Sequence, residues 1–195
     1  VKAVNYYDSG VLQFDQVVHR LLTKLDSKGY LDNAIIVITG DHGEMLGEKN
    51  YFGHQYRVDE GGLRIPLILQ RRGYKGEPLG DWPLASQIDV APTILDELGI
   101  AAPAVWRGVA LQRPATSRIV YFQQAPQVGL YEVNLSKPLL KYWKNMADGE
   151  EFVYDLQADP DEKSNIAASI DRARLAAWSR EVMGSSVSRQ ESAAD

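Results

Sequence analysis

The densest group of side chains that could do chemistry is the stretch Thr-Gly-Asp-His-Gly-Glu, residues 39–44. Within it Asp41 stands directly before His42, and a glycine flanks the pair on each side. Glycines let the backbone turn sharply, so that two adjacent side chains can reach one point. A carboxylate oxygen beside an imidazole suits Zn, Mn or Fe, and the oxygen also suits Ca or Mg. Asp41 and His42 are therefore candidate ligands of a divalent metal ion.

Two ligands do not complete a metal site, because usual coordination needs at least one more protein ligand. A cap or a surface turn is thus the alternative for this pair. His54 follows Gly53 in an aromatic-rich loop, and its position alone indicates a surface or packed histidine. His19 lies inside an apolar helical pattern without a suitable ligand one turn away, which predicts a helix-surface residue.

Glu44 and Glu48 are four residues apart, and paired carboxylates can serve as general acid and base. Gly47 lies between them and favours a loop over a helical face. We therefore expect these two carboxylates to orient the loop or the metal ligands.

The elements that must position this stretch are a helix and two short strands. Apolar residues recur at three- and four-residue steps from Val11 to Leu25, which predicts an amphipathic helix ended by Gly29. The apolar runs Ala34–Ile38 and Ile65–Leu69 predict strands buried on both faces, as in a parallel sheet. Ligands bind beyond the carboxyl ends of such strands, which is where residues 39–44 lie. A second helix is expected over Asp89–Leu98.

Beyond Pro103 the pattern changes to short runs separated by turn signals, which predicts an antiparallel sheet followed by a helix. We accordingly divide the chain into an α/β part at 1–103, a β subdomain with the terminal helix at 104–184, and a flexible tail at 185–195. The expected strands are Arg118–Gln124, Gly129–Leu135, Leu139–Trp143 and Glu151–Asp155, the expected helix is Ile166–Met183, and a Gly- and Pro-rich loop is expected over residues 74–83.

Composition excludes several classes of function. The chain has 195 residues, 45% of them hydrophobic, which supplies a real core. It has no cysteine, so thiolate metal sites and a cysteine nucleophile are absent from these residues. The net charge of −5 argues against nucleic acid as a partner. No apolar run approaches the roughly 20 residues of a membrane-spanning helix.

Several segments, in the right order, resemble the sulfatase branch of the alkaline phosphatase superfamily. Asp32–Glu48 is similar to that family's strand and metal loop, and Tyr51–Ile68 to the segment after it. Gln87–Ile100 resembles the helix after the second strand, and Glu151–Ala167 the closing strand and turn. Together the similarity covers about residues 5–170 of the chain.

The resemblance implies an α/β fold, a three-layer α/β/α sandwich of the alkaline phosphatase type, with a small antiparallel sheet and a C-terminal helix. It implies that Asp41 and His42 bind the divalent metal, for which Ca, Mn and Zn are the candidates. It also implies that His54 contacts the sulfate or phosphate group of the substrate, a small molecule, glycan or lipid ester.

The resemblance further implies that this chain matches the C-terminal half of such an enzyme. In the family the nucleophile, a formylglycine, threonine or serine, lies upstream of the matching segments. No catalytic residue is therefore expected within the chain, and we expect it to be inactive without an N-terminal half in the same or another chain. A bacterial, periplasmic or extracytoplasmic protein, with or without an upstream membrane anchor, is expected, and a cytoplasmic one stays open.

The activity expected from this resemblance is metal-dependent hydrolysis of sulfuric esters. The segment from Arg64 to Pro66 and the ending from Tyr154 to Asn165 resemble sulfatases. The Asp41-His42 pair, in contrast, is shared with bacterial phosphoethanolamine and phosphoglycerol transferases and with phosphonate monoester hydrolases, which form the first alternative. A sulfatase-like module that binds a ligand without turnover is the second.

Overall fold

A computed structural model describes residues 2–73, 79–80, 82–113 and 116–191 of the chain. It divides into two compact units, which are described separately. The first comprises Val1–His54 and Arg64–Glu77, and the second comprises Gln55–Leu63 and Pro78–Asp195. The polar stretch at 39–44 therefore belongs to the first unit, and the antiparallel sheet to the second.

Helix α1, Lys2–Asp26, is the longest element of the first unit. It ends as the sequence predicts: the N–H of Gly29 donates to Asp26 O at 2.9 Å and that of Tyr30 to Leu25 O at 3.1 Å. These two bonds, with a φ of 75° at Gly29, form a Schellman motif, whose left-handed position favours glycine. The helix begins nine residues earlier than the expected start at Val11, because the apolar period does not mark where the backbone first turns helical.

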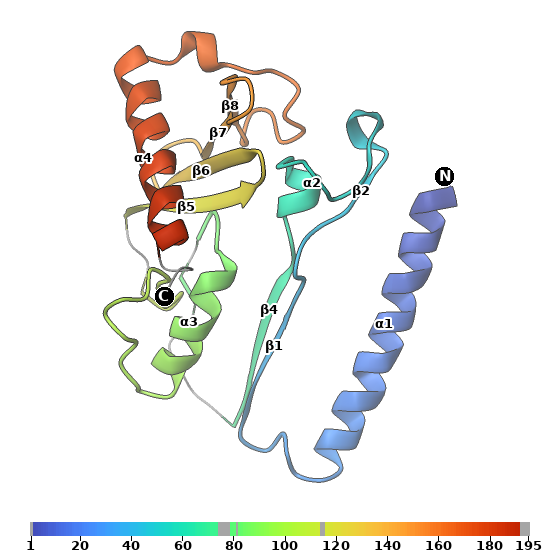
Figure 1. Ribbon diagram of the computed structural model, residues 1–195. Helices are drawn as coiled ribbons and strands as arrows, with labels where there is room; N and C mark the ends of the chain where they lie inside the picture. The colour runs from blue at the N-terminus through green and yellow to red at the C-terminus, as the bar shows by residue number, and fades with distance from the viewer. Residues whose placement is uncertain (1, 74–78, 81, 114–115, 192–195) are drawn as a thin grey trace. The chain divides into compact units, whose positions relative to one another are not determined.

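Strands β1 (Ala34–Thr39) and β4 (Leu67–Arg72) form an antiparallel pair, in register from Ala34 opposite Arg72 to Thr39 opposite Leu67 (Figure 1). The expectation of a parallel, doubly buried pair is wrong, since β1 is only half-buried and, among the described residues, pairs with β4 alone. An apolar run predicts a strand but does not specify its direction. Pro66 lies just before β4, and its carbonyl accepts the Thr39 hydroxyl at 2.9 Å.

A small hairpin follows the polar stretch. Strand β2 (Met45–Leu46) pairs antiparallel with β3 (Phe52–Gly53), and a one-turn 3-10 helix at Glu48–Asn50 joins them. Gly47 has a φ of 124°, a backbone conformation that side chains other than glycine disfavour. The loop expected from Gly47 is therefore confirmed as the turn of this hairpin.

The second unit contains a four-stranded antiparallel meander in the order β5-β6-β7-β8. Its strands were all predicted from the sequence to within two residues at each end. They are β5 (Ser117–Gln124), β6 (Gln127–Asn134), β7 (Leu140–Asn145) and β8 (Glu151–Asp155).

Helix α4, Arg172–Glu191, packs on one face of this sheet (Figure 1). The core between helix and sheet contains Leu130 and Tyr142 of the sheet and Trp178 of the helix, each less than 5% exposed. The opposite face of the sheet holds Tyr131 and its neighbours, because successive residues of a strand point to opposite sides. The backbone of α4 runs beyond the expected end at Met183, as far as Glu191. Residues 192–195 lie outside the described part.

Short helices precede the sheet: α2 (Glu60–Leu63), a 3-10 turn at Gln87–Asp89 and α3 (Val90–Glu97), while a further 3-10 turn at Ala167–Ser169 precedes α4. The predicted helix over Asp89–Leu98 is thus confirmed as α3. Asp89 is fully buried and binds Arg118 with both carboxylate oxygens, at 2.6 and 3.0 Å. Part of the expected loop at 74–83, residues 74–78 and 81, lies outside the described residues.

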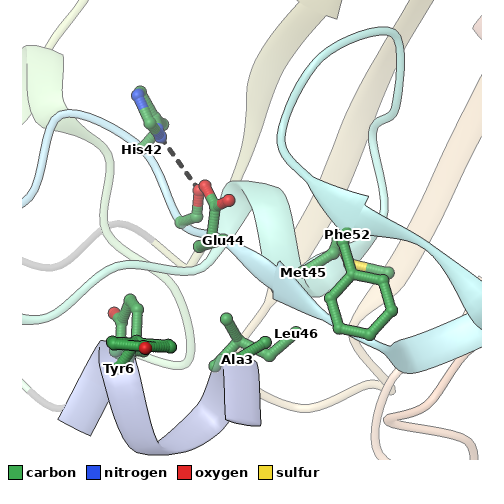
Figure 2. Close-up of a pocket in the computed structure, with 9 residues that line it drawn as sticks. Ala3, Tyr6, His42, Glu44, Met45, Leu46 and Phe52 are labelled. Atoms are coloured by element: carbon green, nitrogen blue, oxygen red, sulfur yellow. Dashed lines mark hydrogen bonds between the residues drawn. The ribbon is translucent and has the colours of Figure 1, made fainter.

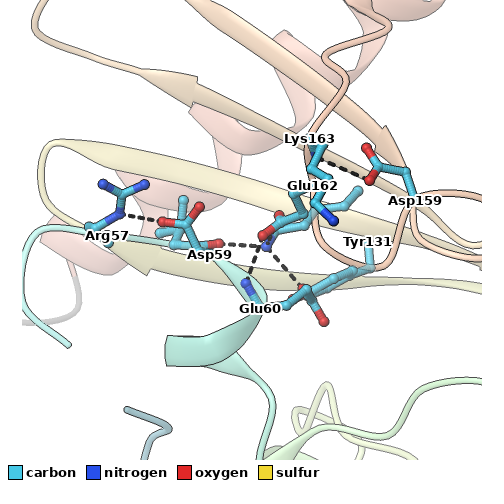
Figure 3. Close-up of polar contacts among 9 residues, drawn as sticks. Arg57, Asp59, Glu60, Tyr131, Asp159, Glu162 and Lys163 are labelled. Atoms are coloured by element: carbon cyan, nitrogen blue, oxygen red, sulfur yellow. Dashed lines mark hydrogen bonds and ion pairs between the residues drawn. The ribbon is translucent and has the colours of Figure 1, made fainter. Parts of the chain in front are cut away.

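A buried ionic cluster ties α2 to the sheet of the same unit (Figure 3). The ammonium of Lys141, fully buried on β7, lies 2.9 Å from Glu60 and 2.6 Å from Glu162. It also donates to the carbonyl of Val58 at 2.5 Å, and the Tyr131 hydroxyl donates to Glu60 at 2.6 Å. Two carboxylates surround one buried cation here, so removing that cation would leave both of them without their counter-charge.

No helix among the described residues is long and apolar enough to cross a membrane.

Candidate metal centre

The structure places the carboxylate of Asp41 and the imidazole of His42 side by side just after β1. Asp41 Oδ2 lies 3.8 Å from His42 Nε2, and the two side chains are 90% and 46% exposed. Two ligands that each lie about 2.0–2.2 Å from one ion cannot be more than about 4.4 Å apart. The separation of this oxygen and nitrogen is compatible with a shared divalent ion, for which further ligands would be needed.

Backbone groups prepare both side chains. The N–H of His42 donates to Asp41 Oδ1 at 3.0 Å, and this bond, with the neighbouring imidazole of His42, holds the pKa of Asp41 below its usual value. The carboxylate is thereby kept ionised, the form that binds a cation. His42 Nδ1 lies 2.9 Å from the carbonyl of Gly43, a contact that requires the proton on Nδ1. The lone pair of His42 Nε2, on the side of Asp41, is then available to bind a metal ion.

His54 joins this group from the other arm of the hairpin. Its ring stacks on that of His42, with centroids 3.9 Å apart and an interplanar angle of 29°. Its Nδ1 donates to Glu44 Oε2 at 2.7 Å, and the two side chains are 39% and 33% exposed. His54 is therefore no isolated surface histidine, the alternative that its position in the sequence left open.

The pairing of Glu44 with His54 follows from the register of the hairpin. Met45 lies opposite Gly53, so the next residues outward, Glu44 and His54, continue that register. Cross-strand neighbours have Cβ atoms about 5 Å apart, within reach of one hydrogen bond. Sequence reasoning missed this pair, because it depends on a turn centred on Lys49, two residues beyond the Gly47 that marked the loop.

The remaining candidates have other places. Glu48 accepts the N–H of Leu46 at 2.6 Å and so fixes the backbone of the hairpin turn, consistent with a role in orienting the loop. Glu44 orients His54 in the same sense. His19 is an exposed residue of α1, as predicted.

An open pocket of about 570 Å³ adjoins the group (Figure 2). His42, Glu44 and Phe52 contribute to its wall on the hairpin side. Ala3, Tyr6 and Tyr7 of α1, an element of the same unit, line it as well. Exposed aromatic rings such as those of Tyr6, Tyr7 and Phe52 offer flat apolar surface to a ligand.

Comparison with known proteins identifies the family. The sulfatase family profile matches residues 2–100, which is half of the chain and includes the whole polar stretch. The chain belongs to the sulfatase family. Its curated relatives among the sulfatases include N-acetylglucosamine-6-O-sulfatase of Bacteroides thetaiotaomicron, 30% identical over 183 residues, which are 86% of this chain and 32% of the relative.

Further sulfatases extend the comparison. Choline-sulfatase of Rhizobium meliloti is 30% identical over 186 residues, covering 88% of this chain and 35% of the relative. A solved sulfatase in complex with its substrate D-glucosamine-2-N,6-O-disulfate is 28% identical, with a TM-score of 0.62 over 93% of this chain and 39% of that one. The α/β fold class of the alkaline phosphatase type, expected from the sequence, is thereby confirmed. The chain spans about a third of the length of the curated relatives it matches.

Proposed function

We propose that this chain supplies the metal-binding loop of a sulfuric ester hydrolase, with Asp41 and His42 as ligands of a divalent ion and His54 as a contact to the sulfate group. One observation carries the proposal: within a sulfatase segment, Asp41 Oδ2 and His42 Nε2 lie 3.8 Å apart, with the ring of His54 stacked on that of His42. Ca, Mn and Zn are the candidate ions, because a carboxylate accepts all three and an imidazole favours the last two.

The roles of the side chains follow from their contacts. A divalent ion bound here would neutralise charge on a sulfate oxygen and favour attack by an ionised nucleophile. Asp41 supplies the negative charge that holds a cation, and its lowered pKa keeps that charge at neutral pH. His54 donates its Nδ1–H to Glu44, so its Nε2 faces away from Glu44, and in the imidazolium form the Nε2–H can donate to a sulfate oxygen of the substrate.

The nucleophile belongs, in this proposal, to polypeptide outside residues 1–195. Two facts support this: the chain has no cysteine from which a formylglycine could be made, and it spans about a third of its relatives. The missing half lies either in the same polypeptide or in a partner chain.

The proposed substrate is the sulfate ester of a sugar. The N-acetylglucosamine-6-O-sulfatase relative and the structure in complex with a sulfated glucosamine support this class. The pocket beside His42 adds Tyr6, Tyr7 and Phe52, whose rings suit the apolar face of a sugar.

Hydrolysis by the complete protein that carries this chain tests the proposal. It should be measured with glucosamine 6-sulfate, an aryl sulfate and an aryl phosphate, each with and without added divalent ion. Metal-dependent release of sulfate, from the sugar above all, is expected. Cleavage of the phosphate ester alone would move the function to the phosphate and phosphonate branch, and tight binding without cleavage of any ester would indicate a binding module.

A further inference from the structure

We infer that His42, Glu44 and His54 form a second metal site in this loop, one that takes a transition-metal ion of the Zn²⁺ or Co²⁺ class. The inference goes beyond the proposed function, since it uses a different set of ligands and requires no turnover. It shares His42 with the pair proposed above, and because the imidazole offers a single free lone pair, the two sites cannot be filled at the same time.

The positions of the donor atoms carry the inference. One ligand atom from each of the three side chains lies within 4.8 Å of the other two. Two ligands on opposite sides of one ion are at most about 4.4 Å apart, so the donor atoms are already close to the spacing that one ion requires. The rings of His42 and His54, now stacked with centroids 3.9 Å apart, must rotate out of the stack to aim a lone pair each at the ion. His42 and Glu44 directly precede strand β2, and His54 directly follows strand β3. The register of this hairpin already places Glu44 opposite His54.

The chemistry of the donors selects the class of ion. Two imidazole nitrogens with one carboxylate oxygen form a set that favours Zn²⁺, Co²⁺ or Ni²⁺, whereas Ca²⁺ and Mg²⁺ prefer oxygen ligands throughout. Three protein ligands also leave room for water on the ion, and the partial exposure of all three side chains admits that water.

Binding moves one proton within His54. The 2.7 Å contact between His54 Nδ1 and Glu44 Oε2 holds a proton that the ion would displace, and this proton transfers through solvent to Nε2, so that the bound imidazole stays neutral. Two ligands at a tetrahedral angle on Zn²⁺ are about 3.4 Å apart, so this contact must open by about 0.7 Å. Neither residue is fully buried, which leaves both side chains room for that movement.

Titration of the 195-residue chain with Co²⁺ and Zn²⁺ tests the inference. We expect one Co²⁺ per chain with the visible absorption of a nitrogen-ligated ion, displaced by Zn²⁺. Calorimetry should show Zn²⁺ binding at least tenfold tighter than Ca²⁺. Glu44→Gln and His54→Gln should each weaken Zn²⁺ binding at least tenfold, whereas Asp41→Asn should change it less than threefold. His19→Gln is the matched control, because His19 is an exposed histidine of α1, and it should change nothing.

The outcomes separate this inference from the proposed function. Binding of Zn²⁺ that survives both Glu44→Gln and His54→Gln, or Ca²⁺ that binds as tightly as Zn²⁺, would overturn the inference. Loss of Zn²⁺ binding in Asp41→Asn with unchanged binding in Glu44→Gln would also overturn it, while supporting the proposed ligand pair. Circular dichroism of each variant shows whether the fold is kept, and Glu44→Gln, which preserves the shape of the side chain, decides if His54→Gln unfolds.

Discussion

The carboxylate of Glu44 accepts a hydrogen bond of 2.7 Å from Nδ1 of His54, across the β2–β3 hairpin. This contact sets which nitrogen of His54 carries the proton, because an ionised carboxylate can only accept. It places one carboxylate behind the imidazole that we propose as the contact to substrate. The loop thus orients its histidine with a residue that is not itself a proposed ligand of the catalytic ion.

Replacing Glu44 should therefore change the tautomer of His54. In Glu44→Ala, the fraction of His54 protonated on Nδ1 should fall, because its acceptor is gone, and ¹⁵N NMR of the imidazoles measures this fraction. His42 provides an internal control, since the carbonyl of Gly43 holds its Nδ1–H. In the complete protein kcat/KM should fall about 10- to 100-fold. An unchanged His54 tautomer would contradict this role of Glu44.

The buried cation of the second unit should be essential for stability. Lys141→Met keeps the apolar stem but leaves Glu60 and Glu162 without their counter-charge, and the free energy of unfolding should fall by about 3–5 kcal/mol. Urea denaturation measures the change. Lys163→Met is the control, because Lys163 pairs with Asp161 at the surface and should leave the midpoint unchanged. A Lys141→Met variant as stable as the wild type would show that the cluster does not stabilise the fold.

Two glycines should respond in opposite ways to alanine. A Cβ at Gly108 would lie 1.9 Å from the carbonyl oxygen of Ile88, so Gly108→Ala must displace backbone and should cost roughly 1–3 kcal/mol or more. At Gly10, inside α1, the added Cβ meets nothing within 4 Å, and Gly10→Ala should stabilise the helix by roughly 0.5–1 kcal/mol. Thermal unfolding of both variants checks the pair. A Gly108→Ala protein without loss of stability would refute the close approach.

Stability should decline in alkaline solution through a buried tyrosine. Burial and the charges of Glu162 and Asp59 raise the pKa of Tyr154 to about 12, against an ordinary value of 10.0. Between these two values the unfolded chain loses the phenolic proton while the folded chain keeps it. The contribution of Tyr154 to the free energy of unfolding should therefore be constant below about pH 10 and fall from there to about pH 12. Tyr154→Phe should reduce that slope in urea titrations, and an identical slope would exclude Tyr154 as its source.

The sequence predicted the elements better than their partners. The strands of the meander are short runs separated by turn residues, and each was predicted to within two residues of its ends. The run Ala34–Ile38 predicted β1 but not its antiparallel pairing with β4, because direction depends on the path of the chain between two strands. Likewise, the period of α1 predicted a helix, yet Phe14 on its apolar side is 58% exposed. Periodicity identifies a face and does not say what covers it.

For the candidate site, the sequence indicated individual residues but not which of them lie together. Asp41 and His42 were found because adjacent ligand types lie between glycines. The neighbourhood of Glu44 and His54, ten residues apart, required the register of a hairpin whose strands have only two residues each. Strands so short leave almost no periodic signal in a sequence.

The most direct test of the central claim is the metal content and sulfatase activity of the complete protein in which Asp41 is changed to Ala. Wild-type protein loaded with Ca²⁺, which the site of His42, Glu44 and His54 disfavours, should retain one ion per chain after dialysis and release sulfate from an aryl sulfate. Asp41→Ala should lose both the bound ion and the activity while keeping its circular dichroism spectrum, and His19→Ala should behave as wild type. Full metal content and undiminished release of sulfate in Asp41→Ala would contradict the assignment of this loop as the metal centre.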